Sequence, residues 1–99
     1  MPDDLATVPI AEAPLRRRCR VSGRIRSVRI RPGVQVPVFE IVVDDGTGRM
    51  VGAFWGRRSI PGVEPGTVIE IEGTPRIHEG EVAMANPLYT LRPARSDGG

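Results

Sequence analysis

The chain lacks lysine entirely, and it contains one cysteine, one histidine and only four aromatic residues. Cys19 cannot form an intrachain disulfide, and its alternation with Val21 predicts a small buried side chain. His78 has no second histidine or nearby cysteine, so we expect no metal site. No apolar stretch approaches the roughly 18 residues that span a bilayer, and the N-terminus lacks the basic-then-apolar order of a signal peptide. These absences predict a cytoplasmic protein without cofactor, metal or membrane insertion.

The sequence also lacks an uninterrupted helical pattern, because ten prolines and twelve glycines are spread along its 99 residues. This length suits one domain. Residues 1–14 show no periodicity and residues 94–99 end in Ser-Asp-Gly-Gly, so both segments are expected to be flexible. The folded unit is therefore predicted to be one all-β domain over residues 15–93.

Alternating apolar and polar residues indicate β-strands. Five strands are predicted, over residues 16–31, 36–44, 49–57, 68–77 and 81–91. In the first strand Val21 and Ile25 are odd-numbered whereas Ile30 is even-numbered, so we expect one extra residue, a β-bulge, near Arg26 and Ser27. A long bulged strand can bend enough to take part in both halves of a small barrel.

The same alternation predicts the core and the turns. The thirteen core candidates are Val21, Ile25, Val28, Ile30, Phe39, Ile41, Val43, Met50, Phe54, Ile69, Ile71, Val82 and Met84. A tight hairpin is expected at residues 45–48, where two glycines can take positive φ and Asp45 stabilises the turn. Residues 57–67 are expected to be a connector. Trp55 has the outward parity of the third strand, which predicts an exposed indole.

Eight of the fourteen arginines fall between Arg16 and Arg31, a stretch without any acidic residue, although the net charge of the whole chain is only +2. Their alternation with apolar or small residues predicts a row of guanidinium groups on one strand face, which suits a polyanion such as nucleic acid. A solvated strand face that discourages edge pairing is the alternative. The exclusive use of arginine is equally compatible with a GC-rich genome and with selection for guanidinium chemistry.

This strand pattern resembles the OB-fold, a five-stranded Greek-key barrel that binds oligonucleotides. Residues 39–55, FEIVVDDGTGRMVGAFW, look like the second and third strands of single-strand-binding OB domains. Residues 66–73, GTVIEIEG, and 84–89, MANPLY, are similar to the wedge OB domain of RecG helicases and to small stand-alone actinobacterial OB-fold proteins. The resemblance implies binding of single-stranded DNA or RNA with weak sequence specificity, and an aromatic stacking platform at Trp55.

The candidate nucleic-acid-binding residues combine cations with one aromatic platform. They are Arg20, Arg24, Arg26, Arg29, Arg31, Trp55, Arg57 and Arg58. The arginines would donate to phosphates, and a base would stack on the indole. The alternative role for Trp55 is to close one end of the barrel. The hypothesis therefore requires an exposed indole and arginines that neighbouring carboxylates do not neutralise.

The sequence shows no nucleophile with a base, no phosphate loop and no zinc motif, so we expect a protein that is not an enzyme. The rival hypothesis is an OB-fold protein-interaction module that docks onto an acidic partner and never contacts nucleic acid, since fold does not settle function. The sequence pattern does not distinguish DNA from RNA as the ligand, and it does not specify the oligomeric state or the pathway.

Overall fold

The computed structural model describes residues 5–32 and 35–92 of the chain. Within them lie a short 3-10 turn and seven strands: η1 (Ile10–Glu12), β1 (Cys19–Arg31), β2 (Val38–Asp44), β3 (Arg49–Trp55), β4 (Val68–Gly73), β5 (Arg76–His78), β6 (Glu81–Ala85) and β7 (Leu88–Arg92). The strands form one sheet in the order β5-β6-β3-β2-β1-β4-β7. The predicted all-β class is confirmed. Among the residues described, no helix has the length and apolar character needed to cross a bilayer.

The strand count differs from the predicted five because two expected strands are interrupted. The fourth is divided into β4 and β5 around Pro75, and the fifth is divided into β6 and β7 at Asn86 and Pro87. A proline cannot donate to a strand ladder, and Asn86 has a φ of 47°, which is outside the extended region. The short β5 therefore becomes a hairpin partner of β6.

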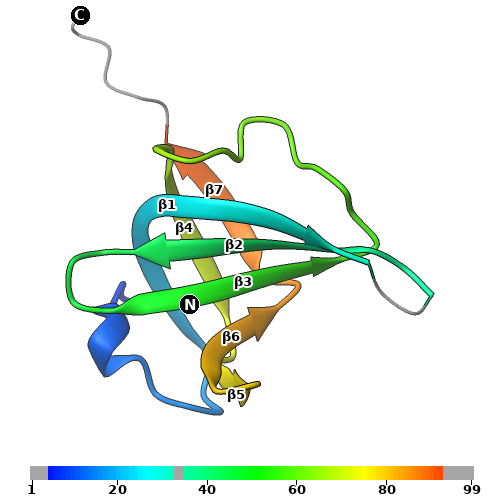
Figure 1. The fold of residues 1–99 in the computed structure, drawn as a ribbon. Coiled ribbons are helices and arrows are strands. Elements are labelled where there is room, and N and C mark those ends of the chain that lie inside the picture. Colours follow the sequence, from blue (N-terminus) through cyan, green and yellow to red (C-terminus); the bar gives the residue numbers. More distant parts are fainter. Residues whose placement is uncertain (1–4, 33–34, 93–99) are drawn as a thin grey trace, which may run out of the picture.

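β1 bends sharply and pairs with a different strand in each half (Figure 1). Its first half runs antiparallel to β4, and its second half runs antiparallel to β2. The register shifts between Ile25 and Ser27, which confirms the predicted bulge at Arg26. At Gly23 a Cβ atom would lie 2.7 Å from the carbonyl oxygen of Asp44, so only glycine fits where β2 approaches the bend.

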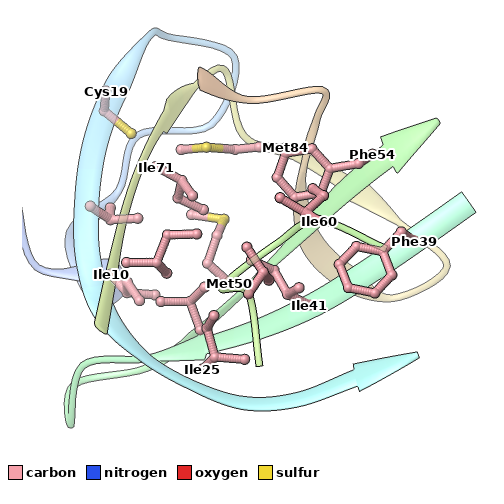
Figure 2. Close-up of a cluster of buried hydrophobic side chains, with 14 residues drawn as sticks. Ile10, Cys19, Ile25, Phe39, Ile41, Met50, Phe54, Ile60, Ile71 and Met84 are labelled. Atoms are coloured by element: carbon pink, nitrogen blue, oxygen red, sulfur yellow. The ribbon is translucent and has the colours of Figure 1, made fainter. Parts of the chain in front are cut away.

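The core lies between the bent β1 and the strands β2, β3, β4 and β6, whose apolar side chains point toward one another (Figure 2). All but three of the thirteen predicted core side chains are buried. Val28 and Val82 are half-buried and pack against the cluster. Ile30 is 50% exposed, so its prediction is wrong. The pairing of β1 with β4 ends at Arg24, so the far end of β1 extends beyond the part of the sheet that encloses the core.

Segments outside the strands cover the core. Ile10 is buried although it precedes the predicted start of the folded unit at residue 15, and Thr7 bridges to Arg20 of β1. The fold therefore begins earlier than expected, whereas residues 1–4 and 94–99 lie outside the described residues. The connector at residues 57–67 also contributes buried side chains, Ile60 and Val63, which the alternation pattern of strands could not identify. Cys19 is buried as predicted, and burial raises the pKa of its thiol.

Asp45 joins the β2–β3 turn to η1. Its carboxylate accepts hydrogen bonds from the N–H of Ile10 at 2.9 Å, from the hydroxyl of Thr47 at 2.6 Å, and from the N–H groups of Thr47 and Gly48. Burial alone would raise the pKa of Asp45, but these hydrogen bonds outweigh burial and the pKa is lowered. The turn-stabilising role predicted for Asp45 is confirmed.

The lowered pKa of Asp45 makes stability depend on pH. A carboxyl whose pKa is lower in the folded state stabilises the fold above its unfolded pKa of about 3.9, and this contribution is lost as the pH falls through the folded pKa. We expect Asp45→Asn to lower the free energy of unfolding by about 1–2 kcal/mol at neutral pH and to weaken its acid dependence. Urea unfolding followed by circular dichroism, at neutral pH and at about pH 3, measures both effects.

Glu64→Gln is the matched control, because Glu64 is exposed and no ion pair or side-chain hydrogen bond is found for it within residues 5–32 and 35–92. This control should unfold like the wild type at both pH values. An Asp45→Asn variant with wild-type stability at neutral pH would contradict the anchoring role of Asp45.

Candidate nucleic-acid interface

A groove of about 750 Å³ lies across β2, β3 and β6. Its floor includes Val38 and Glu40 of β2, Ala53 of β3, and Ala83 and Ala85 of β6. β6 runs parallel to β3, with Ala85 opposite Ala53. Because the methyl side chains of these alanines are small, they leave open space above the sheet, and this space forms the groove.

A connecting segment and a short strand form the walls of the groove. One wall comes from the end of β1 and the β1–β2 connection, through Arg31, Pro32, Gln35 and Val36. The other wall is the short strand β5, whose residues 76–78 all line the groove. In Figure 1 the β1–β2 connection extends past the end of β3, while β5 lies on the far side of β6. The groove is therefore a shallow, mainly apolar channel with walls on both sides.

Trp55 ends β3 and lines this groove. Trp55 is 53% exposed, so its predicted surface position is confirmed and its indole does not close the core. The β6–β7 junction holds this strand end in place: the N–H of Trp55 donates to Oδ1 of Asn86 at 3.0 Å, and the N–H of Asn86 donates to the carbonyl oxygen of Ala53 at 2.7 Å. The indole is thus presented to solvent from a fixed backbone.

The β1 arginines do not form one unpaired row. Arg20 pairs with Glu70 and Glu72 of β4, both at 3.0 Å. Hydrogen bonds from Arg20 and Arg18 hold the pKa of Glu72 below its ordinary value, so this carboxylate stays charged. At the bulge itself, Arg26 pairs with Asp44 at 3.3 Å. The bulge and the bend therefore direct the arginines toward carboxylates of two different neighbouring strands.

Glu40 neutralises the next part of the predicted row from beneath the groove. Glu40 is only 8% exposed, and its carboxylate pairs with Arg29 at 2.8 Å and with Arg31 at 3.3 Å. Arg24 instead donates to the carbonyl oxygen of Gly66. The ion pairs lower the free charge of the other candidate β1 arginines, so the row provides less attraction for an anion than the sequence suggests.

Arg31 also crosses to the β5–β6 turn. Its Nη1 donates to Oε1 of Glu79 at 3.2 Å. The hydrogen bond to Glu79 and the charge of Glu40 raise the pKa of Arg31. Glu79 itself has a φ of 53°, in a turn that continues into Gly80. This contact joins the two walls of the groove.

Three arginines near the indole keep their charge uncompensated. Within the described part of the chain, no ion pair or side-chain hydrogen bond is found for Arg57, Arg58 or Arg76. The first two follow Trp55 after Gly56, as the sequence predicted, and Arg76 lines the groove. The sequence pattern does not identify Arg76, because the alternation predicts it to lie inside a longer fourth strand. Its position as the single cation in the acidic stretch of residues 70–81 is the sequence feature that could have identified it.

Across residues 5–32 and 35–92, no three His, Cys, Asp or Glu side chains gather in a way that could hold a metal ion. No protein-family model matches the chain, and no curated protein matches it. The interpretation of the groove therefore depends on its own geometry and charges.

Proposed function

We propose that the chain is a small OB-fold module that binds single-stranded nucleic acid, DNA or RNA, with weak sequence preference and without catalysis. The strand connections support this fold. β1 pairs with both β2 and β4, and β3 runs parallel to β6. β6 lies near one end of the strand order and β7 at the other, yet only Asn86 and Pro87 separate them in sequence. Five strands result when β4 and β5 are counted as one interrupted strand and β6 and β7 as another, which is the strand number of the Greek-key barrel that we propose.

The observation that carries the proposal is the half-exposed indole of Trp55 inside a groove over β2 and β3. In OB-folds the face of these strands, between the loops after the first and fourth strands, is where oligonucleotides bind. The connection after β1 and the end of β5, just before its turn into β6, form the walls of this groove, which supports the comparison. A base can stack on the indole, while Val38 and the alanine floor exclude water from its edge.

The uncompensated arginines would bind the phosphates. Arg57 and Arg58 follow Trp55 by two and three residues in the chain, Arg76 lines the same groove as Trp55, and their guanidinium groups can donate paired hydrogen bonds to phosphate oxygens. Few polar side chains line the groove, namely Gln35 and His78 apart from the charged residues. Stacking and phosphate contacts do not read base edges, so weak sequence preference follows.

A titration of the protein with single-stranded DNA, RNA and duplex tests this function. Trp55 is the only tryptophan, so its fluorescence reports the groove directly. We expect quenching by single strands, with a slope of log affinity against log salt of roughly −2, because about three phosphates each contribute about −0.7. Unchanged fluorescence and no binding at low ionic strength would exclude the proposal.

The rival function, docking of an acidic protein partner, has one observation in its favour. The groove walls expose the apolar side chains of Val36 and Ile77 beside Arg76, which would also suit a peptide that combines apolar and acidic residues. If such a peptide quenches Trp55 and no oligonucleotide does so, the groove is a protein-binding site.

Glu79 should compete with a phosphate for Arg31. We expect Glu79→Gln to raise the affinity for single strands about two- to fivefold, because it removes an exposed ion pair that bound phosphate must replace. Glu81→Gln is the control, since it removes the same charge from the same hairpin without a hydrogen bond to Arg31. Equal gains for the two variants, measured by fluorescence titration, would show that only net charge matters.

A further inference from the structure

A second hollow, of about 340 Å³, adjoins the groove. Its lining includes Arg18, Glu72, Thr74, Arg76, Asn86 and Leu88. Arg76 and Ala85 line both hollows, so these two residues lie where the hollows adjoin. The second hollow is near the lower end of the size range of ligand sites, which suits a single small group.

The polar groups of this hollow favour an anion. Within the described residues Arg76 makes no ion pair, and Arg18 uses only its Nε, at 2.9 Å from Oε2 of Glu72. The Oδ1 of Asn86 already accepts the N–H of Trp55, which leaves its amide N–H groups as donors. Glu72 is the one carboxylate in the lining, and it is held by both Arg18 and Arg20. Hydrogen-bond donors and positive charges in this hollow therefore outnumber its single negative charge.

We propose that this second hollow binds a phosphate of the same nucleic-acid strand that stacks on Trp55, with Arg18 and Arg76 as its cationic contacts. This inference rests on the proposed function. The strand would pass from the indole over Ala85, past Arg76, to Arg18, and the exposed side chain of Leu88 would contact the sugar. Only a strand long enough to reach both hollows gains the second contact.

Arg18 is suited to this role because the fold does not depend on it. Its side chain is 51% exposed, and an exposed ion pair contributes about 0–1 kcal/mol to stability. Glu72 would keep Arg20 as a partner after Arg18 is removed. A variant at Arg18 therefore tests the contact with ligand rather than the stability of the protein.

Arg18→Ala and Arg92→Ala form a matched pair. Arg92 is 59% exposed and pairs once with a β4 carboxylate, Glu70, but it lines neither hollow. Each protein is titrated with oligothymidylates from two to about twelve nucleotides, which covers most of the site sizes known for OB folds. Trp55 fluorescence is the readout, because it reports the groove for every strand length.

We expect the affinity of the wild type to rise with strand length and then level off. Arg18→Ala should lose about three- to tenfold affinity for long strands, with a salt slope weaker by about 0.7, and should match the wild type for the shortest strands. Arg92→Ala should match the wild type at all lengths. Equal behaviour of the two variants would overturn this inference and leave the proposed function intact. A wild type that binds no strand of any length would overturn both.

Discussion

Trp55→Ala is expected to weaken binding of single-stranded nucleic acid by about 5- to 150-fold, because a base stacked on an aromatic ring contributes about 1–3 kcal/mol. The salt slope should stay unchanged, since the indole contacts no phosphate. The fluorescence signal disappears with the tryptophan, so the affinity is measured by anisotropy of a labelled oligonucleotide. Trp55→Phe should retain part of the lost affinity, because a smaller aromatic ring still stacks.

Tyr89 supplies the control for this experiment. It is also partly exposed, but its ring packs edge-on against Phe54, with centroids 5.7 Å apart, and it does not line the groove. Tyr89→Leu should therefore bind single strands like the wild type. If Trp55→Ala and Tyr89→Leu bind equally well, the indole is not the stacking platform.

Removing the three uncompensated arginines is expected to have a similarly large effect. The triple variant Arg57→Ala, Arg58→Ala and Arg76→Ala should lower affinity on the order of 100-fold at low salt and weaken the salt slope by about 2, because about three released counterions are lost. Binding is measured by Trp55 fluorescence over a range of salt concentrations. The indole remains in this variant, so residual binding should come from stacking on Trp55 and, for strands long enough to reach Arg18, from one phosphate contact.

A second triple variant distinguishes the effect of the three uncompensated arginines from the effect of net charge. Arg26, Arg49 and Arg92 each pair with a carboxylate and line neither hollow. Replacing these three with alanine removes the same net charge, yet we expect the salt slope to stay near its wild-type value. Equal losses of slope in the two triple variants would show that binding follows net charge and not the groove.

Much of the fold could be predicted because strand alternation is local information. The bulge at Arg26 was visible as a change of parity, and the outward position of Trp55 followed from the buried neighbour Phe54. The exposure of Ile30 was not visible, since parity gives the face of a strand but not where the covering strands end. The burial of Ile10 was missed for a related reason: a short irregular segment carries no period.

The charges of the site were harder to predict because their partners are distant in sequence. Arg20 lies about fifty residues from Glu70 and Glu72, and the stretch around it contains no acid. Such pairing depends on strand order and register, which the local pattern does not specify. Arg76 became a groove residue only because Pro75 separates β5 from β4. The proposed site therefore keeps the predicted Trp55, Arg57 and Arg58, adds Arg76, and relies less on the β1 arginines because most of them are paired.

The most direct test of the account is a map of NMR chemical shifts during titration with a single-stranded oligonucleotide at low salt. The account predicts changes at the single indole N–H, at the groove-lining residues of β2, β3 and β6, and at β5, while the β2–β3 turn around Gly46 stays unaffected. An unmoved indole signal, or changes concentrated away from the groove, would contradict it.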